Sequence, residues 1–523
     1  MTDGDYLGLG SRFRSGPSEL LVATGFSTET RQASYLHYWL GIADLAHVLA
    51  LRDSGVLPAI PGRRLLAALL DLLGKDASDG GYDPVYGDAY NSREHILRAE
   101  LGDDAGWLSL GRTRREAGRV SYYLAARKAL LGLHEAIEVF AATMGDLALA
   151  HAKSWWADLT YWQPAQVSSF GHYLLSFGHE AARHLDRVRQ ARTRCGLVPV
   201  AAGGVAGTTV PLSRMATLRR LGLDGPATTS RDAMWSVDGL LDVAFAAQQV
   251  TLTASRLAED FLLFATEPFG YLRLHDSHCR ASVYLPQKRN PYALSVVRGG
   301  CAVVTGRAAG VVASAGTGSA QTDNWIYNYS ETLDALRLAA QMTELIAEVA
   351  IRASFDTARM ADRALDGFTD AADLAERMVA GQHIDYRTAH TLVARVASAA
   401  EQRGESRLSG ADRASLAGRP GAEPAGTDLR SLVLGRSQDG GAAPGQVRAS
   451  ARTLHDRLAR QQAWRLRALS QAEAATGQLV EQARTASEQV SGWSAGLPST
   501  HTDIGGSAHD RAQDTRRSFR QPA

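Results

Sequence analysis

The stretch CRASVYLPQKRNP at residues 279–291 brings together side chains that can carry acid–base chemistry. Ser282 and Lys288 stand six positions apart, and Asn290 follows shortly after. Two prolines in this stretch fix φ and lack a backbone N–H, so we do not expect it in the middle of a helix. A rigid loop that presents a hydroxyl, an ammonium and an amide suits an anionic substrate. The alternative is a plain solvated loop, in which Ser282 is a turn residue.

Composition and charge exclude several classes of protein. The chain has 523 residues, 45% of them apolar, which is enough for a large core or for two or three domains. With 56 basic and 55 acidic residues the net charge is +1, so neither nucleic acid nor a membrane surface is an expected partner. Three scattered cysteines form no disulfide or zinc pattern. We find no leader-like start and no apolar run long enough for a bilayer, and expect a cytoplasmic protein.

Helical periodicity dominates the chain and predicts a mostly α protein. Apolar residues recur at helix-face spacings over 121–144 and 331–351, and a third long helix is expected within 235–266. Strand-like alternation is scarce. The middle of the chain is therefore predicted to be a bundle of unusually long helices, which must position the loop at 279–291.

Changes in composition divide the chain into four parts. Residues 1–110 carry short elements separated by Gly and Pro, and residues 111–360 hold the long helices. Residues 361–490 are predicted to form a smaller C-terminal helical domain. Residues 491–523 are polar and lose apolar periodicity, which predicts a disordered tail.

The loop sequence SVYLPQKRNP resembles the signature loop of the fumarase/aspartase superfamily, written S-S-x-M-P-x-K-x-N-P. Further stretches are most similar to argininosuccinate lyase: DDAGWLSLGRTRREA at 103–117 resembles its H-T-G-R-S-R-N-D region, and LTYWQPAQVSSFGHYLLSF at 159–177 its T-H-x-Q-x-A-Q-P region. The resemblance covers roughly residues 8–470 in order. It implies a three-domain chain whose long-helix bundle assembles as a homotetramer. Each active site of that family draws its motifs from three subunits.

The resemblance also implies the reaction, which is elimination of fumarate from a dicarboxylate substrate without metal or organic cofactor. A base removes a proton next to a carboxylate, and the resulting aci-carboxylate expels the leaving group. Ser282 aligns with the serine that acts as this base, Lys288 with the lysine that stabilises the charge, and Asn290 with the amide that binds a carboxylate. Val283 and Leu285 replace a serine and a methionine of the signature, and neither change need stop proton abstraction.

Several further residues align with positions that contact substrate in the family. They are Arg112, Arg114, Thr160, Gln166, Ser230, Arg231 and Tyr327. Arginine forks suit the carboxylates of a succinyl group. Other roles remain open: Arg231 could pair with Asp232, and Thr160 and Gln166 could satisfy backbone groups. For Arg119 we expect a solvated helix start, and for His47 a packed, hydrogen-bonded histidine.

Three departures from the family fall on the leaving-group side. Tyr161 stands where the family has the histidine associated with general-acid chemistry, and a tyrosine stays protonated at neutral pH and can still donate. Arg115 stands where the family has a substrate-contacting asparagine. In YNYSETLD at 327–334, Ser330 and Thr332 replace the aspartate and glutamine that recognise a guanidinium, which should weaken binding of a cation.

These observations predict a carbon–nitrogen lyase of a specialised pathway, which keeps the succinyl half of its substrate and has changed the other half. Two alternatives stay open. One is a genuine argininosuccinate lyase with an unusual site, and the other is a catalytically idle structural paralogue. Retention of Ser282, Lys288 and Asn290 together argues against the idle paralogue.

Overall fold

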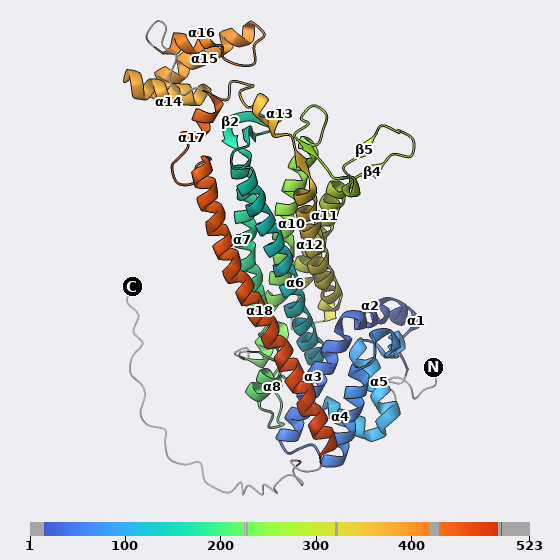
Figure 1. Ribbon diagram of the computed structural model, residues 1–523. Helices are drawn as coiled ribbons and strands as arrows, with labels where there is room; N and C mark the ends of the chain where they lie inside the picture. Colours follow the sequence, from blue (N-terminus) through green and yellow to red (C-terminus); the bar gives the residue numbers. More distant parts are fainter. Residues whose placement is uncertain are drawn as a thin grey trace, which may run out of the picture.

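Long helices run side by side through most of the molecule (Figure 1). The computed structural model describes residues 15–223, 225, 229–318, 323–417, 428–489 and 493. The helices of the bundle are α6 (Arg114–Ala150), α7 (Phe170–Arg194), α10 (Asp238–Phe264), α11 (Tyr292–Ala315), α12 (Ile326–Arg352) and α18 (Pro444–Glu488). The predictions of a mostly α chain and of a central bundle are confirmed.

Helix α6 is the central member of the bundle. Thr113 caps its first turn by accepting a hydrogen bond from the Glu116 N–H at 3.3 Å. Apolar residues then recur on the faces that meet α3, α7, α12 and α18, and Tyr122, Ile137 and Phe140 are fully buried. Each such side chain contributes about 1.5–3 kcal/mol through burial. With 37 residues, α6 extends roughly 55 Å at 1.5 Å per residue.

The N-terminal part packs against one end of the bundle. Its helices are α1 (Glu19–Leu21), α2 (Ser27–Arg31), α3 (Ala33–Asp53), α4 (Ala59–Leu73) and α5 (Ala89–Leu101). A fully buried carboxylate, Asp44 of α3, joins this part to the start of α6. Arg93 of α5 donates to it at 3.0 and 3.2 Å, and Arg112, just before α6, donates at 2.7 Å. The ion-paired group therefore fixes three segments against one another.

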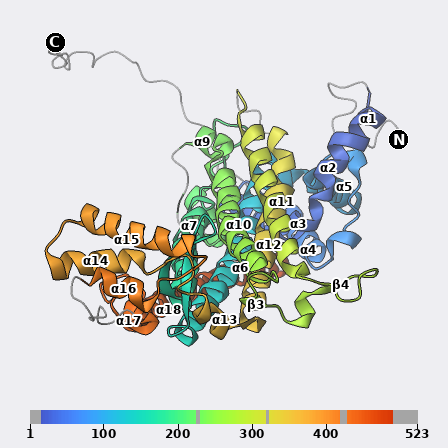
Figure 2. The same cartoon turned by 90° about the horizontal axis from the view of Figure 1, so that it is seen from above.

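Residues 361–490, which were predicted to form one helical domain, form two packing units instead. Helices α14 (Ala371–Gln382), α15 (Tyr386–Gln402) and α16 (Gly410–Leu416) enclose a small core of their own. Figure 2 shows them to one side of the bundle. Helix α18 instead returns along α6, α7 and α4, and its Leu454 and Leu479 join the main core. Arg465 of α18 donates to Glu138 of α6 at 3.0 Å.

Short helices and strands connect these parts. The helices are α8 (Arg214–Arg220), α9 (Ser230–Trp235), α13 (Thr357–Asp362) and α17 (Leu429–Leu434). Antiparallel pairs are formed by β1 (Trp155–Thr160) with β2 (Gln163–Ser169), β3 (Leu272–Arg273) with β6 (Ser354–Phe355), and β4 (Arg280–Ala281) with β5 (Arg289–Asn290). The predicted disordered tail at 491–523 lies outside the described residues except for Trp493, whose indole packs near Arg52 of α3.

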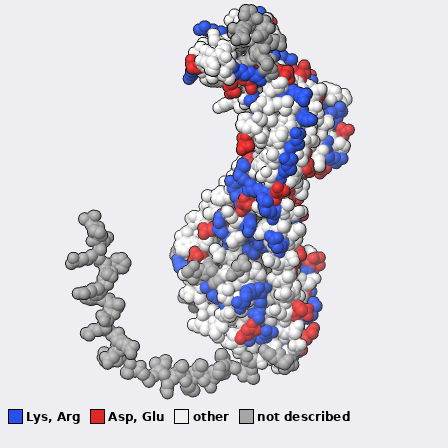
Figure 3. All heavy atoms as spheres, turned by 60° about the vertical axis from the view of Figure 1, so that its left-hand side comes forward, with Lys and Arg blue, Asp and Glu red and all other residues white. Residues whose placement is uncertain are grey.

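Helix α11 corrects the expectation that no apolar run could span a bilayer. Among the described residues it is the one helix long and apolar enough by length and composition, and 28% of its most apolar window is buried. Its Arg298 pairs with Glu259 of α10 and its Arg307 with Glu331 of α12, so it is a member of the bundle. Figure 3 shows basic and acidic side chains interspersed over one face of the molecule, as the balanced charge predicts.

Replacing Asp44 with asparagine should strongly destabilise the fold. The change leaves two buried guanidinium groups without a counter-charge, which costs about 3–5 kcal/mol. Asp53, at the other end of α3, also pairs with two arginines but is exposed, so Asp53→Asn should cost no more than about 1 kcal/mol. Urea unfolding followed by circular dichroism compares the two variants, and equal losses would contradict this account of Asp44.

Candidate active site

The proline-containing loop projects from the bundle between β4 and β5 (Figures 1 and 2). Arg280 pairs with Asn290 and Ala281 with Arg289 across the two strands. The Asn290 amide nitrogen donates to the Arg280 carbonyl at 3.1 Å. Arg289 donates to the Leu274 carbonyl at 2.8 Å and pairs with Asp276 at 2.7 Å. These contacts hold the base of the loop, while its tip reaches into solvent.

Ser282 and Lys288 lie at opposite ends of this exposed tip. The Ser282 hydroxyl accepts a hydrogen bond from the Leu285 N–H at 3.0 Å, the geometry of a turn. Among the residues that the structure describes, no hydrogen bond or ion pair engages the Lys288 ammonium, which is exposed. Among the described residues, no basic or cationic side chain forms a hydrogen bond with the Ser282 hydroxyl. Groups from outside the loop must therefore complete its chemistry.

A second group of predicted site residues lies on the hairpin of β1 and β2. Tyr161 and Trp162 form its two-residue turn, with Thr160 paired to Gln163. Both turn residues have positive φ, 55° and 58°, and their side chains are 97% and 56% exposed. This backbone favours Asn-Gly, and an aromatic residue there is strained by about 1 kcal/mol or more. Within the described residues, no hydrogen bond or ring contact of the exposed Tyr161 side chain offsets this strain.

Thr160 and Gln166 share this hairpin, and both are exposed. Thr160 is the last residue of β1 and caps no helix. The Gln166 amide faces Arg436, whose guanidinium donates to the amide oxygen at 2.8 Å when that oxygen is turned toward it. Arg436 also donates to the Val167 carbonyl and pairs with Asp373, so this contact joins the hairpin to α14.

The third group lies at the start of α6, where Arg112 departs from its predicted role. Its guanidinium is buried and is committed to Asp44 and to the Ala43 carbonyl, so it does not face a substrate. Arg119 is not solvated as expected. It is buried, donates to the Met234 carbonyl at 2.8 Å and lies over the Trp325 ring at 4.7 Å. His47 is packed as predicted, and its Nε2 lies 3.0 Å from the Leu110 carbonyl.

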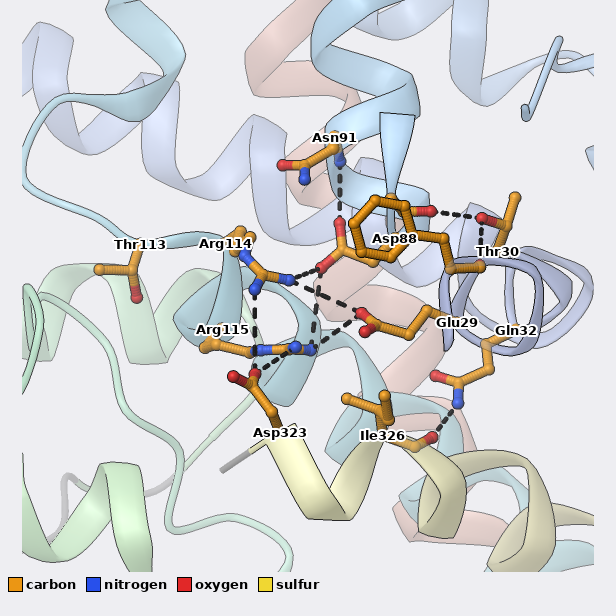
Figure 4. Close-up of polar contacts among 12 residues, drawn as sticks. Glu29, Thr30, Gln32, Asp88, Asn91, Thr113, Arg114, Arg115, Asp323 and Ile326 are labelled. Atoms are coloured by element: carbon orange, nitrogen blue, oxygen red, sulfur yellow. Dashed lines mark hydrogen bonds and ion pairs between the residues drawn. The ribbon is translucent and has the colours of Figure 1, made fainter. Parts of the chain in front are cut away.

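Arg114 and Arg115 instead point toward three carboxylates (Figure 4). Arg114 lies 2.7 Å from Asp88, and Arg115 lies 3.3 Å from Glu29; Asp323 pairs with both arginines. Glu29 and Asp88 are largely buried, whereas the Asp323 side chain is 66% exposed. Burial raises the pKa of the Glu29 carboxyl, and Arg115 acts in the opposite direction. The two arginines are the cations of this cluster, and their side chains are 37% and 17% exposed.

Glu116 anchors the first turn of α6 to the loop that follows α7. Its carboxylate accepts the backbone N–H groups of Ala201 and Ala202 at 2.8 and 2.9 Å. Burial raises the pKa of Glu116 to about 7, against the opposing effects of Arg112 and of the backbone donors. Glu116 stands at the aspartate of the family motif, and its role here is to hold the backbone.

Ser230, Arg231 and Tyr327 lie near the same end of the bundle as Arg114 and Arg115. Ser230 begins α9, and Arg231 stacks over the Trp235 ring at 4.8 Å; within the described residues it forms no pair with Asp232. Tyr327 lies in the first turn of α12 with about half of its side chain exposed. A shallow hollow beside α9 is lined by Arg231, Trp235 and Thr317.

One chain does not bring the three groups together. The arginines begin α6, whereas the hairpin of Tyr161 follows its far end, which is roughly 55 Å away along the helix. The loop of Ser282 lies beside the hairpin end of the bundle and not beside the arginines (Figure 1). A single chain therefore carries the parts of a site but does not assemble one.

Comparison with known proteins finds lyases of similar sequence and structure. A family model described as Lyase matches residues 89–306. Argininosuccinate lyase of Methanoculleus marisnigri is 30% identical over 81% of this chain and 88% of its own. Argininosuccinate lyase 1 of Mesorhizobium japonicum is 30% identical over 86% and 97%. The structure of EDDS lyase in complex with formate has a TM-score of 0.80 at 25% identity, over 91% of this chain and 97% of that chain. Class II fumarase of Schistosoma mansoni, 14% identical with a TM-score of 0.67 over 79% and 93%, shares the fold.

A bundle of long helices with a Ser/Lys/Asn loop of this sequence is typical of a class of helical lyases. The chain belongs to the fumarase/aspartase superfamily, and its relatives identify it as a carbon–nitrogen lyase of the argininosuccinate lyase type. Sequence reasoning missed Asp44, Glu29, Asp88 and Asp323. No local signal marks them, because each carboxylate is far in sequence from the arginine that it contacts.

The strained hairpin gives a test of the turn geometry. Trp162→Gly should be more stable than Trp162→Ala by about 1 kcal/mol, because glycine adopts positive φ without steric cost and alanine does not. Both variants remove the same aromatic ring, so their difference isolates the backbone. Urea unfolding at one protein concentration measures it, and equal stabilities would contradict a left-handed Trp162.

The raised pKa of Glu116 predicts a pH-dependent contribution to stability. Between its ordinary value of 4.5 and about 7, the folded state holds a proton that the unfolded state has lost. This contribution is therefore full below pH 4.5 and is lost as the pH rises through 7. The stability of wild type relative to Glu116→Gln should fall from pH 5 to pH 8, by up to about 3 kcal/mol. Thermal unfolding across this range tests it, and a difference that rises with pH would overturn it.

Proposed function

We propose that this protein eliminates fumarate from an N-substituted, or similarly substituted, succinate in a specialised pathway. The observation that carries the proposal is the loop in which Ser282, Lys288 and Asn290 stand at the positions of the superfamily's signature, on an exposed hairpin. The relatives named argininosuccinate lyase and the similar structure of EDDS lyase support carbon–nitrogen cleavage. None of these comparisons supplies the leaving group.

The proposed chemistry begins with proton abstraction. Ser282, as the alkoxide, takes the Cβ proton, and the electron pair moves into the adjacent carboxylate to form an aci-carboxylate dianion. The Lys288 ammonium and the Asn290 amide stabilise the charge on the oxygens. The electron pair then forms the Cα=Cβ bond as the Cα–N bond breaks with its electrons leaving on nitrogen. Tyr161 is the proposed donor of the proton that this nitrogen takes up.

We further propose that the active unit is a homotetramer in the cytoplasm. The length of α6 supports assembly, because it separates the arginines from the hairpin within one chain. Helix α11 also exposes Val303 and Val312, an apolar face that a second bundle would cover. Each site would combine the loop of one chain with the hairpin and the arginines of others.

A second candidate is argininosuccinate cleavage in arginine synthesis. The names of relatives that are 30% identical over most of the chain favour it. Against it, Ser330 and Thr332 replace the residues that recognise a guanidinium in the family, and Thr332 is committed to Tyr122 at 2.8 Å inside the core. The two candidates differ only in the leaving half of the substrate.

Ultraviolet absorbance of fumarate tests the proposal directly. Wild-type protein should release fumarate from at least one of argininosuccinate, adenylosuccinate, aspartate, or an N-substituted or nitro-substituted succinate. Ser282→Ala should lower that rate by at least about 10²-fold, because the proposed base is removed. Thr305→Ala, on the neighbouring α11, should leave it unchanged. Full activity of Ser282→Ala, or no fumarate from any compound, would refute the proposal.

A further inference from the structure

We propose that Arg115 selects substrates whose leaving half carries an anionic group, and that Asp323 lies where that group would bind. The inference rests on the proposed function and names the class of leaving group that it left open. Arg115 stands at a position where the family has a substrate-contacting asparagine, so a neutral amide has been replaced by a long cation. The contacts of Arg115 show which of its partners a ligand could replace.

The three carboxylates around Arg115 are not equivalent. Glu29 and Asp88 have side chains that are 9% and 13% exposed, and each is built into its own helix start (Figure 4). Asp88 accepts the Asn91 N–H at 2.9 Å as the N-cap of α5. Asp323 is 66% exposed and lies in a short turn before α12. Glu29 and Asp88 are therefore fixed counter-charges, and Asp323 is the exchangeable one.

Among the described residues, the cluster is open to a ligand on the side of Asp323. On the inner side of the two arginines, the cavity lined by Leu36, Leu40 and Tyr90 holds about 20 Å³, which is room for one water molecule. A substrate group cannot enter there. The Asp323 side is open to solvent, so a ligand that reaches the Arg115 guanidinium does so where the Asp323 carboxylate now lies.

Charge decides which ligand fits that place. Without Asp323, the two positive charges of the arginines equal the two negative charges of the fixed carboxylates. An anion in the place of Asp323 restores the observed arrangement of charges. A cationic leaving group would instead meet Arg115 directly, because every carboxylate of the cluster is already engaged. A carboxylate on the leaving half matches the guanidinium fork.

A purely structural cluster is the competing explanation. Asp323 would then only tie the turn before α12 to α6, and Asp323→Asn would weaken the fold without changing which ligand binds. The two explanations differ in ligand discrimination, which a stability measurement alone cannot report.

The test uses two probes of nearly equal shape. N-(carboxymethyl)aspartate carries an anionic substituent, and N-(carbamoylmethyl)aspartate carries its neutral amide counterpart. Titration calorimetry on the Ser282→Ala protein, as its full assembly, measures binding without turnover. We expect the carboxymethyl probe to bind about tenfold or more tightly than the carbamoylmethyl probe, as for other charge-assisted pairs.

Variants added to Ser282→Ala assign this preference to Arg115. Arg115→Gln should abolish it. Asp323→Asn should tighten the carboxymethyl probe about fivefold, because a competing carboxylate is removed, and should leave the carbamoylmethyl probe within about twofold. Asp242→Asn, which removes an exposed aspartate paired with Arg194 on the side of α10, is the matched control and should change neither affinity.

Each other outcome overturns the inference. Equal affinities for the two probes, no detectable binding of the carboxymethyl probe, or an Asp323→Asn effect that is the same for both probes would show that Arg115 does not select an anion. Fumarate release by the wild-type protein is measured separately. Its presence without discrimination would leave the proposed function standing and refute only this selection by Arg115.

Discussion

The buried carboxylate of Asp44 is the constraint on which the arrangement of the site depends. It receives the guanidinium groups of Arg93 and Arg112, and all three side chains are removed from water. A charge in that position is tolerated only when it is paired and hydrogen-bonded, so the three segments have one arrangement that satisfies it. Because Arg112 is held inward, Arg114 and Arg115 begin α6 at a set position and face Glu29 and Asp88. The buried contact of Arg112 with Asp44 therefore sets the positions of Arg114 and Arg115.

The length of α6 then determines what one chain can do. A straight helix of 37 residues keeps its two ends apart, and within the described residues no loop joins the arginines to the hairpin of Tyr161. Among the described residues, neither the Tyr161 ring nor the Lys288 ammonium has a hydrogen bond or an ion pair. Tyr161 stands in a strained turn, and the ammonium of Lys288 is exposed. Strain and exposure at such positions are characteristic of sites that are completed elsewhere.

Much of the fold could be predicted from the sequence, because helix periodicity is a local property that tertiary packing reinforces. The separate core of α14–α16 and the return of α18 could not, since both depend on contacts between distant segments. The same limit applies to single residues. The family resemblance predicted that Arg112 binds substrate, but its partner Asp44 lies 68 positions earlier, and only packing shows that the guanidinium points inward. Ser282, Lys288 and Asn290 were found because their loop is contiguous.

The departures from the family are best understood as one change rather than three. A general acid matters in proportion to the basicity of the group that leaves, and a tyrosine whose pKa is ordinarily near ~10 is a weaker donor at neutral pH than an imidazolium. Tyr161 therefore suits a leaving group that needs less help from a proton. An arginine beside that group lowers the same demand, because it stabilises negative charge that remains on the departing fragment. Tyr161 and Arg115 lie far apart in the chain, and in the proposed tetramer each would make the other tolerable by meeting it at one site.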